Sequence, residues 1–283
     1  MSTENIKVTV SVLMTAYNRE KYIGEAIESV LNSKYQDFEL IIVDDCSSDR
    51  TLEIAKAYEK TDPRIKVYHN STNLGQFANR NKAASYAQGK YLKYLDSDDS
   101  IIPECLQEMV DAMEKYSDAG MGFCHTIGKT NKQFPFKVQP QESFITHFFQ
   151  GGLLFTGPSG VIFKTNAFEN VGGFEEFGMP SDNHLNLKIA ARYPVVAVRE
   201  DLFIWRQHDE QVFSVNKKNY FNIIHNYKFT ADIIKRFSPL NEKENKKVMF
   251  NQKKILFLNL FRLSFRKGKP ILALRILKQL SKS

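Results

Sequence analysis

The segment Tyr91-Leu-Lys-Tyr-Leu-Asp-Ser-Asp-Asp99 begins as a short aliphatic and aromatic stretch and ends in the carboxylates of Asp96, Asp98 and Asp99. A strand that runs into such a cluster gathers negative charge at its carboxyl end, which is unfavourable unless a cation or a donor-rich ligand neutralises it. Carboxylate oxygens suit Mg²⁺ or Mn²⁺, ions that commonly arrive with the phosphates of a substrate. Because Asp and Ser are also ordinary turn residues, a solvated turn explains this segment equally well when it is taken alone.

Strands and helices are predicted to alternate along the chain that leads to this segment. The apolar patterns predict strands at 7–14, 38–43, 65–69 and 90–95, and helices at 22–31, 48–58 and 79–88, with Gly89 as the cap of the last helix. This alternation implies a mostly parallel sheet with helices on both faces. Ligands of such sheets bind in the crevice beyond the carboxyl ends of the strands.

Each of the four predicted strands ends in polar side chains. These are Thr15 and Tyr17, Asp44 and Asp45, Asn70 and Asn73, and Asp96 and Asp98. Because the carboxyl ends of parallel strands meet at one edge of a sheet, a shared binding site is favoured over four separate turns. Beyond residue 105 the patterns are less regular, with helices predicted at 106–116 and 182–192, strands at 121–126 and within 195–205, and helices from residue 216 onward.

The composition is that of an ordinary globular protein. Of the 283 residues, 42% are hydrophobic and 25% are charged, which suits one large α/β domain or a domain with an appendage. No run reaches the roughly 18–20 apolar residues that a bilayer crossing requires. The first residues lack the pattern of a signal peptide, and three cysteines without metal-ligand spacing fit a reducing compartment. A cytoplasmic location is therefore expected.

Positive charge is concentrated in the last quarter of the chain. Residues 215–283 contain 17 Lys and Arg but only three Asp and Glu, whereas the preceding residues contain 22 and 29. Hydrophobic residues alternate with these basic ones in predicted helices, so the segment can lie at an anionic membrane interface, at the inner face of the cell membrane. Packing on the body or on a second subunit, as in a homodimer, are the alternatives.

Four motifs occur in a fixed order along the first hundred residues. They are Val10-Ser-Val-Leu-Met-Thr-Ala-Tyr-Asn18, Ile42-Val-Asp-Asp-Cys-Ser-Ser-Asp49, Asn73-Leu-Gly75 with Asn79-Arg-Asn81, and Asp96-Ser-Asp-Asp99. In this combination the chain resembles the family 2 glycosyltransferases, over about residues 6–214. The resemblance implies an α/β fold of the GT-A type, Rossmann-like, with a mixed, mostly parallel sheet flanked by helices and here a C-terminal helical extension. It implies a nucleotide-sugar-binding part at 1–105, an acceptor-binding part of the same domain at 106–214, and a basic helical extension at 215–283.

The resemblance also implies the activity, which is inverting transfer of a sugar from a nucleotide-sugar to a saccharide or lipid-linked acceptor, and a UDP-sugar is the expected donor. It places Thr15, Tyr17 and Asp45 at the base with Asp44 nearby, Asp96 at the ribose, Asp98 on a divalent cation and Asp99 beside it. Asn73 belongs to the same donor site, and Arg19 and Arg80 could meet phosphate or base. For Arg80 a solvent-exposed or salt-bridged position is the alternative.

Inverting transfer needs one general base, and the resemblance assigns that role to Asp182 in Pro180-Ser-Asp-Asn-His-Leu-Asn-Leu-Lys188. This stretch departs from the family pattern at Ser181, His184 and Lys188, and Asp182 would also serve as a helix cap. Gly172-Gly-Phe174 precedes it at the family's spacing. His208, in Trp205-Arg-Gln-His208, is the candidate third metal ligand, with a structural role as the alternative.

Two functions of other classes also fit parts of the chain. A nucleotidyltransferase would bind nucleotides too, but it calls for a Gly-rich basic loop after the first strand, which is absent. A nucleic-acid-binding protein would use the basic tail. That function leaves the acidic cluster unexplained, so nucleic acid is not expected as a partner.

Overall fold

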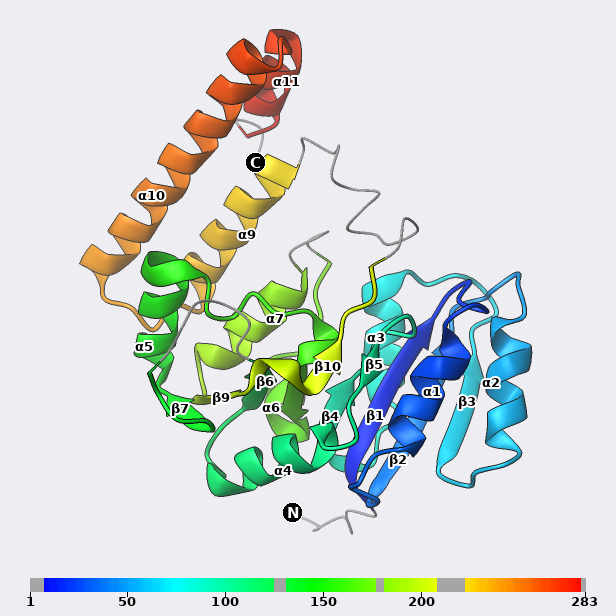
Figure 1. The fold of residues 1–283 in the computed structure, drawn as a ribbon. Coiled ribbons are helices and arrows are strands. Elements are labelled where there is room, and N and C mark those ends of the chain that lie inside the picture. The colour runs from blue at the N-terminus through cyan, green and yellow to red at the C-terminus, as the bar shows by residue number, and fades with distance from the viewer. Residues whose placement is uncertain (1–7, 125–130, 177–180, 208–221, 281–283) are drawn as a thin grey trace.

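The structure is a computed structural model, which describes residues 8–124, 131–176, 181–207 and 222–280. Within these ranges, strands and helices alternate through the first half of the chain (Figure 1). The strands are β1 (Val8–Ala16), β2 (Phe38–Asp44), β3 (Ile65–His69), β4 (Gly89–Tyr94), β5 (Ser100–Ile101), β6 (Met121–Cys124), β7 (Phe136–Val138), β8 (Val161–Lys164), β9 (Val195–Val198) and β10 (Phe203–Ile204). The helices are α1 (Ile23–Leu31), α2 (Thr51–Glu59), α3 (Gln76–Ala84), α4 (Cys105–Lys115), α5 (Pro140–Ile145), α6 (Thr165–Asn170), α7 (Ser181–Ala190), α9 (Asn222–Arg236), α10 (Glu242–Phe261) and α11 (Pro270–Leu280). Short helical turns are η1 (Thr146–Gly151), η2 (Pro158–Gly160), η3 (Glu200–Leu202) and η4 (Arg262–Arg266).

The main sheet of the described residues has eight strands in the order β3-β2-β1-β4-β8-β6-β9-β7. The strands β3, β2, β1 and β4 run parallel, whereas β8 and β7 run antiparallel to their neighbours. The prediction of a mixed, mostly parallel α/β sheet with a C-terminal helical extension is therefore confirmed. The division of the chain at residues 105 and 214 stays a prediction.

Helices cover both faces of the sheet. Side chains of β1 alternate between the faces, so Val12 belongs to a core cluster that includes residues of α1 and α4, and Leu13 to one that includes residues of α3 and α7. Because both faces are covered, most residues of the central strands are buried, including the polar Ser11 of β1 and the charged Lys93 of β4. The sheet is thus a rigid platform whose strand ends carry the polar residues.

One predicted helix is misplaced. The helix predicted at 79–88 is α3, which begins at Gln76 and ends at Ala84, and Gly89 opens β4 instead of capping it. A Cβ atom on Gly89 would lie 2.5 Å from the backbone nitrogen of Ser11, so glycine is required here by the close approach of β1 and β4. The signal that looked like a helix cap is therefore a strand-packing constraint.

The last three long helices form an arm that rises from the body (Figure 1). We call α9, α10, η4 and α11 the C-terminal arm. Its base is joined to the body where His184 Nε2 of α7 lies 2.9 Å from Asp232 Oδ2 of α9. Among the residues that the structure describes, no helix has the length and apolarity required to cross a bilayer.

Candidate active site

The carboxyl ends of β1, β2, β3 and β4 lie along one edge of the sheet. The amide of Asp45 donates to the carbonyl of Ala16 (2.8 Å), and the amide of Asn70 donates to the carbonyl of Asp44 (2.9 Å). β4, which leads to the acidic cluster, lies on the other side of β1. The polar strand ends seen in the sequence are therefore neighbours in space.

Arg80 joins the acidic cluster to α7. Its guanidinium is almost fully buried and donates from Nη2 to Asp96 Oδ1 (2.8 Å) and from Nη1 to Asp182 Oδ1 (2.6 Å). The ring centroids of Phe77 and Phe174 each lie 5.6 Å from Cζ of Arg80. The cation is therefore held by aromatic faces as well as by carboxylates. The salt-bridged position, the alternative given for Arg80, is therefore found, and contact of Arg80 with the donor stays a prediction.

Asp182 lies in the first turn of α7, and its side chain is 22% exposed. Burial raises the pKa of this carboxyl to about 6, while the charge of Arg80 lowers it and the charge of Asp96 raises it. A carboxylate with a pKa near neutrality is ionised under ordinary conditions and still basic enough to accept a proton.

The chain that leads into α7 is fixed to α3. Asn81 donates from Nδ2 to the carbonyl of Phe174 (2.9 Å) and accepts from the amide of the same residue (2.9 Å). Gly173 has φ +64°, and a Cβ atom there would lie 2.6 Å from Asn81 Oδ1. The Gly172-Gly-Phe174 motif therefore lets the backbone approach α3 and places the Phe174 ring beside Arg80.

Within the acidic cluster, Asp98 and Asp99 have different surroundings. Asp98 Oδ2 accepts from Arg19 Nε (3.1 Å), and its side chain is 12% exposed. Asp99 is buried and accepts from the Ser159 hydroxyl (2.6 Å) and from the amide of Arg206 (3.1 Å). Burial raises the pKa of Asp99 to about 7, and the charges of Asp96 and Asp98 add to that effect.

Three residues that support the cluster were not assigned a role from the sequence. Ser159 donates to Asp99 and accepts from the amide of Asp96 (3.0 Å). The buried Lys93 Nζ donates to the carbonyl of Ser159 (2.6 Å), and Arg206 Nε donates to the carbonyl of Asp98 (3.2 Å). Ser159 lies in the segment Thr156-Gly-Pro-Ser-Gly160, in which no local pattern shows that it reaches the cluster.

The paired acids after β2 hold the neighbouring loop. Asp45 is 3% exposed and accepts from Asn70 Nδ2 (2.8 Å) and from the amides of Leu74 (2.9 Å) and Gly75 (3.0 Å). Since a carboxylate has about four acceptor positions, one remains for a ligand. Asp44 Oδ2 accepts from the amide of Ser47 (3.0 Å).

The other oxygen of Asp44, Oδ1, is buried and has no hydrogen-bond partner among the described residues. The remaining predicted donor-site residues also lie at this edge. Thr15 is half-buried at the end of β1, Tyr17 is 48% exposed, and Asn73 Oδ1 accepts from the amide of Gly75 (3.0 Å). His208 lies outside the described residues.

Comparison with known proteins now identifies the family. Residues 11–172, more than half of the chain, match the sequence profile described as "Glycosyl transferase family 2". The chain belongs to this family. TuaG of Bacillus subtilis, a glycosyltransferase named for teichuronic acid biosynthesis, is 43% identical over 115 residues, which cover 41% of this chain and 46% of the relative. This family 2 chain thus spans about half the length of the curated relatives it matches.

Solved structures confirm the GT-A fold. Residues 1–349 of TarS from S. aureus, in complex with UDP-GlcNAc, superpose with a TM-score of 0.69 at 20% identity, covering 91% of this chain and 73% of that one. A mannosyltransferase from Pyrobaculum calidifontis, in complex with GDP-Man and Mn²⁺, gives a TM-score of 0.65 at 18% identity, covering 98% and 79%. At these identities the likeness establishes the fold only.

The acidic cluster of this family 2 chain has donor atoms that suit a divalent cation. Among the described residues, no three His, Cys, Asp or Glu side chains stand together as a complete metal site. Mg²⁺-type ions, however, are commonly held by one or two carboxylates together with water and substrate phosphates. Asp96 and Asp98 retain partial exposure, at 32% and 12% of their side chains, so their oxygens fit this kind of partial site.

His184 and the aromatic stretch after residue 144 pack in the core. His184 is fully buried between α7 and α9, where the rings of Phe229 and Phe237 lie about 6 Å from it. Phe144 and His147 are buried as well. Phe155 differs, because half of its side chain is exposed.

Proposed function

We propose that the chain is an inverting glycosyltransferase that moves a sugar from a nucleoside diphosphate to an acceptor hydroxyl. The observation that carries this proposal is the single guanidinium of Arg80 between Asp96 of the acidic cluster and Asp182 of α7. The contact brings a carboxylate with a pKa of about 6 next to the edge where a nucleotide-sugar would lie. Membership of family 2 and a GT-A fold support the same reaction.

In the proposed reaction Asp182 acts as the general base. Its carboxylate takes the proton of the acceptor hydroxyl, and the acceptor oxygen attacks the anomeric carbon from the face opposite the diphosphate. The bond between the anomeric carbon and the diphosphate oxygen breaks, and its electron pair leaves with the nucleoside diphosphate. Arg80 keeps Asp182 ionised and oriented during this step, because its charge opposes the effect of burial.

The strand ends would bind the nucleoside. Tyr17, half exposed beyond β1, would cover the face of the base, and Asp45 has one acceptor position for a base N–H. Thr15, Asp44 and Asn73 complete this part of the site, and Asp96 would accept from the ribose hydroxyls. Arg19, which pairs with Asp98, would meet the diphosphate.

A divalent cation, Mn²⁺ or Mg²⁺, would be held by Asp98 with Asp96 close by, and His208 and Asp99 remain the other predicted ligands. When bound, such an ion supplies charge neutralisation for the departing diphosphate. The mannosyltransferase of similar fold is described in complex with GDP-Man and Mn²⁺, which supports this assignment. Asp99 is buried and accepts hydrogen bonds from Ser159 and Arg206, which favours a role in positioning the other carboxylates of the cluster.

The acceptor is proposed to be a growing surface glycan, either a free saccharide or a lipid-linked one. Relatives support this class, since one is named for teichuronic acid biosynthesis and another is a glucosyltransferase of Campylobacter jejuni named for an undecaprenol-linked glycan. A UDP-sugar is the first donor to test, because the TarS complex contains UDP-GlcNAc. The other predicted partners, a membrane surface and a second copy, concern the C-terminal arm and not this site.

A donor panel tests the proposal. The full chain is incubated with UDP-, GDP- and dTDP-sugars and Mn²⁺, and release of nucleoside diphosphate is measured. We expect release from at least one donor, and an Asp182→Asn variant that loses about 10²-fold or more of the transfer rate while it still binds that donor. Asp118→Asn, which alters an exposed carboxylate paired with Lys137, is the matched control. No release from any donor, or full activity of the Asp182→Asn variant, would contradict the proposal.

A further inference from the structure

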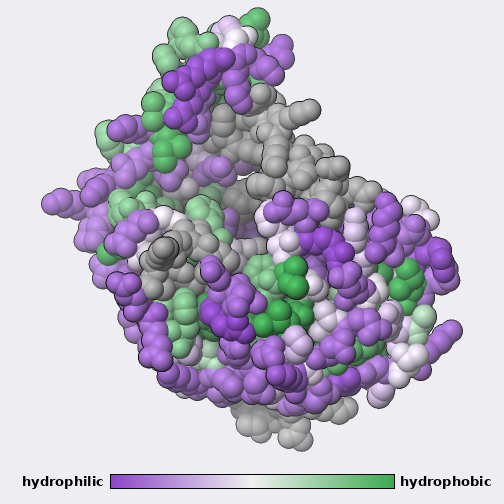
Figure 2. All heavy atoms as spheres, viewed as in Figure 1, coloured by the Kyte–Doolittle hydropathy of each residue, from purple (hydrophilic) through white to green (hydrophobic). Residues whose placement is uncertain are grey.

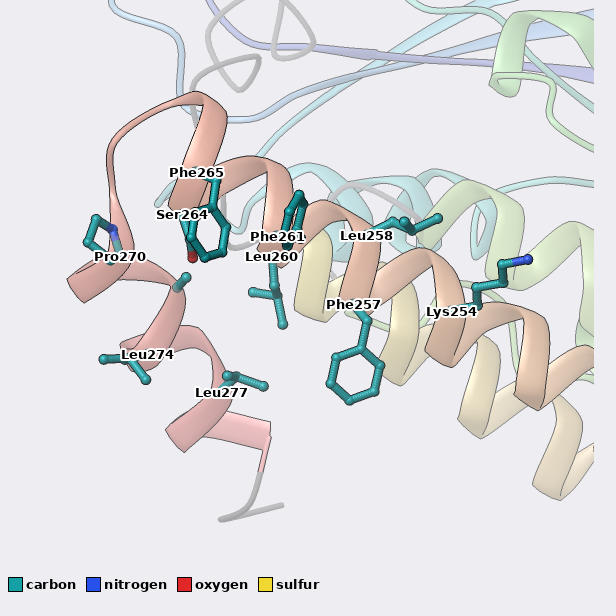
Figure 3. A pocket seen from close by; sticks show the side chains of 11 residues that line it. Lys254, Phe257, Leu258, Leu260, Phe261, Ser264, Phe265, Pro270, Leu274 and Leu277 are labelled. Atoms are coloured by element: carbon teal, nitrogen blue, oxygen red, sulfur yellow. The ribbon is translucent and has the colours of Figure 1, made fainter.

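The tip of the C-terminal arm carries an open apolar groove of about 710 Å³ between the end of α10, η4 and α11 (Figure 3). Phe257, Phe261 and Phe265 line one side, and Leu274 and Leu277 line the other. The three phenylalanine side chains are between 57% and 75% exposed. Such a cluster of large exposed apolar side chains is unusual for a protein surface that contacts only water.

The groove borders the seam that holds the arm together and shares Leu260 and Ala273 with it. Leu256, Leu260 and Leu263 are buried against Ile224 of α9 and Ile276 of α11. The phenylalanines occupy the neighbouring stripe of α10 and η4, spaced by four residues, and the rings of Phe261 and Phe265 lie 4.6 Å apart. The three phenylalanines lie outside this buried cluster and remain exposed on the surface of the arm.

The charged side chains of the segment that forms the groove are basic. No Asp or Glu occurs in residues 245–283, and the exposed side chains of residues 250–278 include eight Lys and Arg. These are Lys253, Lys254, Arg262, Arg266, Lys267, Lys269, Arg275 and Lys278. Figure 2 shows hydrophobic and hydrophilic atoms side by side at the tip of the arm.

We propose that this tip docks on a lipid bilayer with anionic head groups. The phenylalanines and leucines would enter the boundary between head groups and acyl chains, and the basic residues around them would meet lipid phosphates. A second copy of the chain fits less well, because a symmetric contact would bring the same cations together without any acidic counterpart. A nucleic acid would satisfy the cations but leave the apolar stripe in water.

The docked arm also orients the body. In Figure 1 the arm rises on the side toward which β1 points, which is the side of the strand ends that form the candidate active site. A bilayer at the tip therefore faces that side of the molecule. This orientation suits an acceptor that is presented at the lipid surface.

Vesicle binding tests the inference without donor or acceptor, so the result is independent of sugar transfer. The full chain is floated with vesicles of phosphatidylcholine mixed with phosphatidylglycerol and with vesicles of phosphatidylcholine alone. We expect binding to the anionic vesicles only, weakened by added salt. The Arg262→Ser/Arg266→Ser variant should lose more than about tenfold in binding, since each basic residue near an anionic surface contributes roughly fivefold.

A second variant tests the apolar part. Phe261→Ser/Phe265→Ser removes exposed rings, so the helical circular-dichroism signal should be unchanged while vesicle binding falls at least as much. The matched control is Lys243→Ser/Lys246→Ser, which removes two exposed charges at the other end of α10 and should bind like the wild type. The inference would be overturned if the chain bound no vesicles, or if all variants bound equally. It would also be overturned if light scattering showed a dimer that binds no vesicles and that the phenylalanine substitutions dissociate. Binding to DNA in place of vesicles would overturn it as well.

Discussion

Arg80 donates to Asp182 at 2.6 Å across 102 positions of the chain. The same guanidinium donates to Asp96, so the carboxylate on α7 and the acidic cluster after β4 share one buried cation. The pKa of Asp182 is consequently a balance, raised by burial and by Asp96 and lowered by Arg80. A change at Arg80 should therefore be visible in the pH dependence of the reaction.

Replacement of Arg80 by methionine should shift the acidic limb of the rate profile to higher pH. Asp182 must be ionised to act as a base, so activity falls as pH drops through its pKa of about 6. Loss of the opposite charge removes the interaction that lowers this pKa, and an upward shift of about one unit or more is expected. The measurement is kcat/KM against pH for both proteins.

The control for this experiment is Arg64→Met. Arg64 also forms an ion pair with a carboxylate, Asp62, but at the opposite end of β3 from the strand edge that carries the site. Its profile should match that of the wild type. An unchanged acidic limb in the Arg80→Met protein would show that Asp182 does not set the pH dependence.

Substitutions of Asp98 and of Arg19 should change the affinity for a divalent cation in opposite directions. Asp98→Asn removes a charged oxygen ligand, and we expect Mn²⁺ affinity to fall about tenfold or more. Arg19→Met removes a cation that competes for the same carboxylate, with 3.1 Å between Arg19 Nε and Asp98 Oδ2, so Mn²⁺ should bind more tightly. Titration calorimetry or electron paramagnetic resonance without donor measures both, with the surface variant Asp111→Asn as control. Equal affinities in all four proteins would place the ion elsewhere.

The sheet could be predicted because its central strands are rich in apolar residues and are followed by polar ones. β1 and β2 were located to within two residues at either end, and α1 within one. β5 and β10, with two residues each, are too short to show any period, and they exist because they pair with each other. β7 has three residues and is likewise stabilised by pairing with β9.

The sequence predicts which residues belong to the candidate site, but it does not predict which of them contact one another. Motif order located Asp96, Asp98 and Asp182, since each lies next to a recognisable strand or helix. That one arginine would bridge Asp96 and Asp182 depends on how α3 packs against α7, which no local pattern encodes. The same holds for Ser159, which reaches Asp99 from a turn 60 positions away.

Gly89 gives a prediction about stability. A methyl group there would approach Ser11 N to 2.5 Å and Ser11 Oγ to 2.8 Å, so Gly89→Ala must separate β1 from β4. We expect the free energy of unfolding to fall by about 1–3 kcal/mol, measured from urea unfolding. Gly157→Ala is the matched control, because no heavy atom lies within 4 Å of its added Cβ, and the change there should stay within about 0.5 kcal/mol. Equal stability of the two variants would mean that the strands adjust without loss.

His147 should make the fold sensitive to acid. The ring is 5% exposed, its Nδ1 accepts from the amide of Leu154 (3.2 Å), and burial lowers the pKa to about 4 from 6.5. The unfolded chain therefore binds more protons than the folded one between these values, so stability is lost as pH falls through this window. The largest loss that this shift allows is about 3 kcal/mol.

A His147→Asn variant isolates this effect, because the amide oxygen of asparagine can accept the Leu154 hydrogen bond but does not titrate. Its free energy of unfolding should change less than that of the wild type between about pH 7 and pH 4. His225→Asn, a substitution of an exposed histidine on α9, should behave like the wild type. If the wild type and the His147→Asn protein lost equal stability over this range, the acid sensitivity would have to come from other groups, such as the carboxylates paired with Arg80.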